Sequence, residues 1–300
     1  MELWILITIV AAFSQNIRSA LQKNLKNTLS TWGVTGARFV YAAPLALLLA
    51  AFVLSREGDI GLSINGSFVG YGVVAGLGQI LATGLLIHLF SARNFTVATA
   101  LTKTEPIQTA LFGIVLLGEH ISPLIAATIL ISIVGVMLVS IPKGQSVKSG
   151  LFNQSALIGI VSGGLFGLSS VAYRGASLSL EAGGVFLRAS LTLAFVSLFQ
   201  SLMIFIWLRL REPGQTALLL RHWRAAGLVG LAGMVGSLCW TLAVTLETAA
   251  HVRAVGQVEV IFLLATSMLI FKEGLTAREI SGALLVALGV VGLVLATGNA

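Results

Sequence analysis

The chain has 300 residues, of which 57% are hydrophobic and only 10% are charged, and its mean hydropathy is +0.99. A soluble domain has about 25% charged residues, so this composition excludes a soluble protein and predicts an integral membrane protein. The net charge of +7 comes from lysines and arginines in short segments between apolar runs, which argues against a nucleic-acid partner because no basic patch with interleaved aromatic residues is formed.

Ten apolar runs follow one another along the chain, and each has roughly the 18 to 25 residues that a helix needs to cross a bilayer. They cover residues 3–20, 32–54, 67–90, 94–117, 124–141, 150–173, 183–208, 225–246, 249–271 and 277–296. The runs are continuously apolar, whereas the strands of a membrane barrel alternate apolar and polar residues. We therefore predict an all-α integral membrane protein with ten transmembrane helices, embedded as a multi-pass protein in the lipid bilayer of the cell (plasma or inner) membrane.

The sequence contains an internal repeat. At an offset of 154 residues Glu105 aligns with Glu259, and at an offset of 150 residues Arg38 aligns with Arg188. Charged residues thus recur at matched positions in two sets of apolar runs. The repeat predicts two halves with five spans each.

The predicted halves are residues 1–146 and 147–300. Because five is an odd number, the two halves are expected to cross the membrane in opposite directions. Such an inverted repeat has its pseudo-twofold axis in the membrane plane and is typical of alternating-access carriers.

Three short motifs accompany this pattern: Glu-Pro at residues 105–106, Gly-Glu-His at 118–120 and Lys-Glu-Gly at 272–274. Together with ten spans in two repeats, they resemble the EamA-type family of the drug/metabolite transporter superfamily. The resemblance extends over essentially the whole chain. It implies a secondary transporter of small metabolites, often an exporter of amino acids.

The fourth span carries polar residues that a bilayer tolerates poorly. Lys103, Glu105 and Gln108 all lie within it, and a charged residue at a helix centre costs roughly 2.5 to 3.5 kcal/mol on insertion scales. Pro106 removes a backbone donor, so we expect the helix to break there and its polar residues to line a water-filled cavity. The second repeat has Val260 in place of this proline, so a proline-dependent break is expected in the first half only.

Lys103 and Glu105 are two residues apart and do not share a helical face, so each is expected to find a partner on another span. The intramembrane set contains four cations and two glutamates, which favours a substrate with a carboxylate or another anionic group. Structural ion pairs that lock helices together are the alternative for each arginine. The ionisable residues of this set are Arg38, Lys103, Arg188, Arg253, Glu105 and Glu259.

Trp240 lies within the eighth span and is a candidate either for stacking on the substrate or for packing in the core. The candidate substrate-binding residues are therefore Lys103, Glu105, Arg38, Arg188, Glu259, Gln108 and Trp240. A carboxylate that meets both protons and substrate in one cavity is a means of coupling transport to a proton gradient, so protons are a candidate partner. The sequence does not select between amino acids and other small metabolites.

Enzymatic motifs are missing from the sequence. Neither HExxH nor GxSxG occurs, the single cysteine is Cys239, and the four histidines are scattered. We therefore expect no cofactor, no metal site and no enzymatic activity. A membrane-embedded enzyme, a channel and a scaffold without carrier activity are kept as alternatives.

The distribution of lysine and arginine leaves the orientation open. The positive-inside rule places both termini outside, whereas the family resemblance implies both termini inside. The connections after the even-numbered spans, which lie on one side of the membrane, hold only Arg56 and Arg174. The connections after the odd-numbered spans, on the opposite side, hold Lys23, Lys26, Arg93, Lys143, Lys148, Arg209, Arg211, Arg221, Arg224, Lys272 and Arg278.

Overall fold

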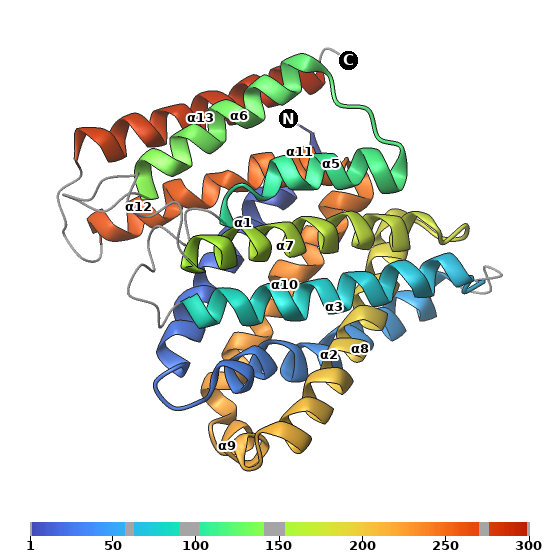
Figure 1. Cartoon of the computed structure of the whole chain (residues 1–300). Helices are drawn as coiled ribbons and strands as arrows, with labels where there is room; N and C mark the ends of the chain where they lie inside the picture. Colours follow the sequence, from blue (N-terminus) through green and yellow to red (C-terminus); the bar gives the residue numbers. More distant parts are fainter. Residues whose placement is uncertain (1, 58–62, 90–101, 141–153, 270–275, 299–300) are drawn as a thin grey trace.

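The computed structural model describes residues 2–57, 63–89, 102–140, 154–269 and 276–298 (Figure 1), and within these ranges the regular secondary structure is entirely helical. Parts of the predicted third, fourth, fifth, sixth and ninth spans and the motif at 272–274 lie outside the described residues. The elements are α1 (Leu3–Leu25), α2 (Thr31–Glu57), α3 (Gly66–Leu89), α5 (Glu105–Leu117), α6 (Pro123–Ser140), α7 (Gln154–Leu178), α8 (Val185–Arg211), α9 (Gln215–Arg221), α10 (Trp223–Leu246), α11 (Ala249–Val255), the 3₁₀ helix η2 (Gly256–Val258), α12 (Glu259–Leu269) and α13 (Ala277–Gly298).

Seven of the described helices are long and apolar enough to cross a membrane, namely α1, α2, α3, α7, α8, α10 and α13. Helices α5 and α6 are apolar but shorter. Large apolar side chains point outward from the bundle: Leu48 is 69% exposed, Val115 78% and Leu210 74%. An outer surface of this kind is stable against lipid and not against water, so the chain is a multi-pass membrane protein.

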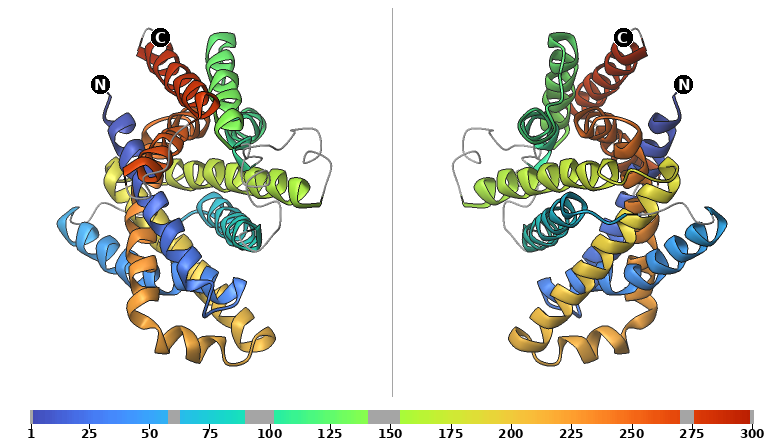
Figure 2. Two further views of the ribbon diagram at one scale, coloured as in Figure 1. Left: turned by 90° about the vertical axis from the view of Figure 1, so that its left-hand side faces the viewer. Right: turned by 90° about the vertical axis from the view of Figure 1, so that its right-hand side faces the viewer.

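The most extensive helix contacts join the part of the chain before residue 141 to the part after residue 153. Helix α6 packs on α13, α3 on α7, α2 on α8, and α1 on α10. Figure 2 shows α6 (green) and α13 (red) as a pair at one edge of the molecule. The two parts of the chain are therefore interleaved and do not form separate bodies.

Backbones approach closely where α6 crosses α13. A Cβ atom added to Gly135 would lie 2.6 Å from the carbonyl oxygen of Gly282, and one added to Gly282 would lie 2.6 Å from the carbonyl oxygen of Gly135. Small residues drive this kind of contact in a membrane, where apolar side chains gain little by leaving lipid.

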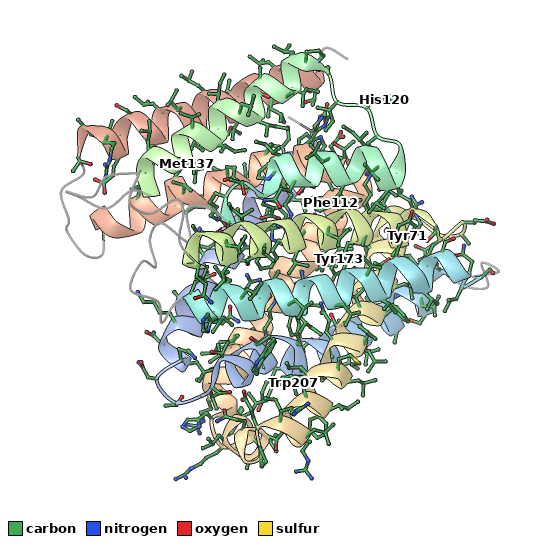
Figure 3. All side chains as sticks on the ribbon, in the orientation of Figure 1. Tyr71, Phe112, His120, Met137, Tyr173 and Trp207 are labelled. Atoms are coloured by element: carbon green, nitrogen blue, oxygen red, sulfur yellow. The ribbon has the colours of Figure 1, made fainter. Side chains whose placement is uncertain are left out.

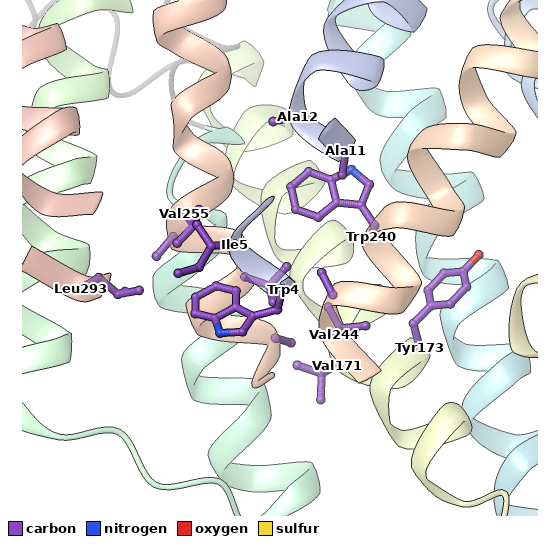
Figure 4. Close-up of a cluster of buried hydrophobic side chains, with 14 of the residues drawn as sticks. Trp4, Ile5, Ala11, Ala12, Val171, Tyr173, Trp240, Val244, Val255 and Leu293 are labelled. Atoms are coloured by element: carbon purple, nitrogen blue, oxygen red, sulfur yellow. The ribbon is translucent and has the colours of Figure 1, made fainter. Parts of the chain in front are cut away.

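The largest buried cluster is made mainly by α1, α6, α7, α10 and α11, with single residues of α3, α8 and α13. Trp4 and Ala11 of α1 lie near Val244 and Trp240 of α10, and Tyr173 of α7 lies beside them (Figure 4). This cluster fixes how α1 and α10 approach the short helix α11, and it thereby positions the polar residues that follow.

Two helices are interrupted at corresponding places. Helix α5 begins at Glu105 with Pro106 in its first turn, and the two residues before it form a turn. In the later part of the chain, η2 separates α11 from α12 although no proline is present. Gly256 starts this 3₁₀ turn, and the ring of Trp240 packs against it. The sequence provided no proline signal for this second break.

Candidate functional site

Two ion pairs meet at these helix breaks. Arg253 Nε lies 3.0 Å from Glu105 Oε1, and the two side chains are only 8% and 13% exposed. Lys103 pairs with Glu259. Each pair joins the chain around α5 to the chain around α11 and α12, so both lysine and glutamate of the fourth span find partners on another span, as their two-residue spacing predicted.

Arg253 is held by further contacts. Its Nε donates to Ser170 Oγ at 2.9 Å, and its guanidinium lies over the ring of Trp240, 4.4 Å from the centroid. A desolvated cation–π contact contributes about 2 kcal/mol. Trp240 thus stacks on a protein cation in this structure, and its ring is buried.

Helix α1 connects the two ion pairs. Gln15 Nε2 donates to Glu259 Oε2 at 2.9 Å, while Trp240 Nε1 donates to Gln15 Oε1 at 3.2 Å. Asn16 Nδ2 also donates to the Glu259 carbonyl oxygen at 3.0 Å. Neither Gln15 nor Asn16 was a candidate from the sequence, because uncharged amides near a span end give no signal above that of ordinary helix packing.

A small cavity lies beside Arg253. Its volume is about 10 Å³, which is close to the space that a single water molecule requires. Among the described residues, the space beside Arg253 is therefore too small for a metabolite. The lining residues are Gln79, Ser170, Tyr173, Ser237, Trp240, Thr241, Val244 and Arg253.

Tyr173 connects the cavity to α3. Its hydroxyl donates to Gln79 Oε1 at 3.3 Å, and Gln200 Nε2 donates to the same oxygen at 2.9 Å. Figure 3 shows Tyr173 at the centre of the bundle, between α7 and α3, and Trp207 far from it on α8. The cavity wall is therefore built from α3, α7, α10 and α11, while Gln200 of α8 holds the Gln79 side chain.

Arg38 is buried two turns into α2, with 3% of its surface exposed. Its NH1 donates to Thr83 Oγ1 at 2.8 Å. Beside it lies Arg18 of α1, which is only 2% exposed. Sequence reasoning missed Arg18, although it lies inside the first apolar run, because an arginine near the end of a span can also reach the membrane interface.

The remaining candidates lie away from the cavity. Gln108 Nε2 donates to Thr104 Oγ1 at 2.8 Å and to the Ile160 carbonyl oxygen at 3.3 Å, so it links α5 to α7. Arg188 is half-buried in the first turn of α8, and the described residues provide no ion-pair partner for it. The structure thus brings Lys103, Glu105, Glu259 and Trp240 together, with Arg38 nearby.

Comparison with known proteins identifies the family. The model of the EamA-like transporter family matches residues 2–141 and 154–295. The chain belongs to the EamA-like transporter family. The resemblance that the sequence motifs indicated is confirmed, and the chain is a membrane transporter of the drug/metabolite transporter superfamily.

Two relatives cover nearly the whole EamA chain. This chain is 22% identical over 293 residues to the pseudopaline exporter CntI of Pseudomonas aeruginosa (strain UCBPP-PA14), and the alignment covers 96% of this chain and 95% of the relative. A crystal structure of a protein with 15% identity superposes with a TM-score of 0.72 and covers 99% of this chain and 98% of its own. This second likeness shows the fold alone.

A third set of charges closes one end of the EamA bundle. Arg174 Nε lies 2.7 Å from Glu119 Oε1, and its NH1 donates to the carbonyl oxygens of Val244 and Glu247 at 2.7 and 2.6 Å. Burial raises the pKa of the Glu119 carboxyl, and the Arg174 charge opposes this shift. Burial also raises the pKa of Glu247, but its hydrogen bonds with His251 and the Thr248 backbone and the nearby positive charges together outweigh burial, so the net pKa lies below the ordinary value. These contacts tie the turn between α5 and α6 to α7 and α10.

Proposed function

We propose that this protein is a secondary active transporter that exports a small metabolite, such as an amino acid, across the inner membrane by alternating access. The observation that carries the proposal is the pair of buried ion pairs, Arg253–Glu105 and Lys103–Glu259, at two helix breaks. Charges at broken helices near a bundle centre are a usual way to bind polar substrate in a membrane. The exporter named among the relatives supports the outward direction.

The proposal includes two inverted repeats of five spans, residues 1–146 and 147–300. The family model matches one segment in each half. A pseudo-twofold axis would exchange α1 with α7, α2 with α8, α3 with α10 and α6 with α13. Under that exchange the contact of α3 with α7 becomes that of α10 with α1, while the contacts of α2 with α8 and of α6 with α13 map onto themselves. This agreement supports a symmetric mechanism in which one half moves against the other.

The ion pairs provide the substrate-dependent step. A zwitterionic substrate would exchange partners with them, its carboxylate taking Arg253 or Lys103 and its amine taking Glu105 or Glu259. Both pairs join the two halves, so their exchange would release one half from the other and allow the closed cavity to open. The two carboxylates are also the groups on which protons would act if transport is coupled to a proton gradient.

The alternatives differ in class. A channel would conduct without saturation, and a scaffold or a membrane-embedded enzyme would show no exchange of labelled for unlabelled solute. Membership of a transporter family favours the carrier.

Counterflow in proteoliposomes tests the proposal. Liposomes loaded with one unlabelled amino acid or related metabolite are diluted into its labelled form, with wild type beside Glu105→Gln and Lys103→Ala. The exposed Arg56→Gln is the matched control. We expect saturable, stereoselective counterflow in wild type and in the control, and its loss in both site variants. Folded wild-type protein without counterflow for any compound, or unchanged counterflow in both site variants, would overturn the proposal.

A further inference from the structure

Within the part of the chain that the structure describes, two arginines of the bundle interior have no carboxylate to pair with. Arg18 and Arg38 are 2% and 3% exposed, and among the described residues the glutamates near the centre are already engaged by Lys103 and Arg253. Burying an unpaired cation in a low-dielectric interior is costly. A chain that keeps two of them side by side is built for an anion that comes from elsewhere.

In α1 and α2, the buried side-chain atoms without a hydrogen-bond partner are all donors. Nε and NH1 of Arg18, Nε of Arg38 and Nε2 of Gln22 are buried without an acceptor. Gln22 lies one turn from Arg18 on the same face of α1, and both are buried. Buried polar groups in native proteins are rarely unsatisfied. Open donors on these two helices call for an acceptor-rich ligand, of which a carboxylate is the simplest.

The two arginines come together against α10. A Cβ atom added to Gly233 would lie 3.2 Å from Arg38 Cγ and 3.6 Å from Arg18 Cδ, so both side-chain stems pass this glycine. Gly233 is one helical turn from Ser237, which lines the cavity beside Arg253, and a turn rises by about 5.4 Å. The arginine pair therefore lies about one turn beyond the central cavity, within the length of a single small metabolite.

We propose that Arg18 and Arg38 form a second anion subsite, so that the transported metabolite carries at least two carboxylate or comparable anionic groups. One group binds at Arg253 or Lys103, and the second binds between the guanidinium groups of α1 and α2. This inference rests on the proposed transport function and extends its substrate site. A small inorganic anion such as chloride has the same charge, and the experiment separates the two sources.

The test compares two nearly isosteric probes, glutarate with two carboxylates and glutaramate with one. The purified protein is heated in chloride-free buffer at constant ionic strength while each probe is titrated, because a ligand that binds the folded state raises the unfolding midpoint in proportion to its affinity. We expect glutarate to stabilise wild type at about tenfold lower concentration than glutaramate, since a bound carboxylate makes charge-assisted hydrogen bonds with guanidinium groups. The exposed Arg56→Gln is expected to keep this preference.

In Arg18→Gln and Arg38→Gln we expect glutarate and glutaramate to stabilise the protein at about the same concentration. We also expect the unfolding midpoint in probe-free buffer not to fall, since each substitution removes an uncompensated charge. Arg18→Lys keeps the charge but loses the planar fork, and is expected to retain part of the preference. Equal stabilisation of wild type by both probes would overturn the inference. So would a preference that survives in both glutamine variants, or chloride stabilisation that is lost in them without any glutarate preference.

The inference and the transport function fail separately. A glutarate preference that depends on Arg18, in protein without counterflow of any compound, would retain the anion subsite and reject transport. Counterflow of a monocarboxylate that is unchanged in Arg18→Gln, together with equal stabilisation by both probes, would retain transport and reject the subsite.

Discussion

The Arg253–Glu105 pair offers the sharpest test of how the site is held together. Glu105→Gln removes one charge and leaves Arg253 buried, and breaking a buried pair from one side costs about 3 to 5 kcal/mol. Ser170 and the Trp240 ring still contact the guanidinium, so we place this variant near the lower limit, at about 3 kcal/mol. Arg253→Gln leaves a buried carboxylate and also loses the stacking contact, so its expected cost lies near the upper limit, about 5 kcal/mol.

The double variant should cost clearly less than the sum of the two single variants. With both charges of the pair removed, neither member is left as a buried ion without its partner, so we expect the double variant to be destabilised by about 4 to 5 kcal/mol and the coupling to be on the order of 3 kcal/mol. Equilibrium unfolding of the four proteins in mixed micelles measures each free energy of unfolding. If the two single-variant effects sum to the double-variant effect within about 0.5 kcal/mol, the reasoning is refuted, because the effects of uncoupled sites are additive.

Three further predictions concern other parts of the molecule. Because the pKa of Glu247 is lowered, its carboxylate stabilises the fold above its ordinary value of 4.5, and this stability is lost as the pH falls through the folded-state value. Glu247→Gln should therefore flatten the acid limb of a stability–pH profile, while a profile identical to wild type would contradict the contact with His251. Gly135→Ala should destabilise the protein by about 1 to 3 kcal/mol, because its new Cβ meets the backbone of α13. A Cβ at Gly227 meets nothing within 4 Å, so Gly227→Ala should stabilise the protein by up to about 1 kcal/mol. Equilibrium unfolding in mixed micelles measures both free energies. Trp240→Phe keeps a ring over the guanidinium but loses the indole N–H bond, so counterflow should persist at reduced apparent affinity; unchanged affinity would show that this bond does not organise the site.

Much of the candidate site could be read from the sequence because charges in an apolar run are rare and costly. Lys103 and Glu105 were identified on this ground, and their spacing excluded a mutual ion pair. The repeat selected Glu259. Composition and run length were likewise sufficient for an all-helical, multi-pass chain, since the bilayer permits few other solutions.

Other features were not readable, for two different reasons. Gln15 is an amide whose role depends on which side chains α1 meets in three dimensions, and nothing in its own segment identifies Glu259 and Trp240 as its partners. The 3₁₀ turn at Gly256 packs against the ring of Trp240, which approaches from a different helix. Arg18 had a sequence signal, but its significance depends on a neighbour, since an arginine near a span end can also reach the interface.

The sequence by itself determined the class of the protein, because hydropathy and the cost of intramembrane charge are local properties that each residue carries with it. Only the tertiary structure decided which charges are neutralised. Glu105 and Glu259 each accept one cation, and Arg18 and Arg38 lie together at Gly233 without a carboxylate among the described residues. Pairing depends on distances of a few ångströms between helices far apart in the chain, and these distances are set by how small residues let the helices approach.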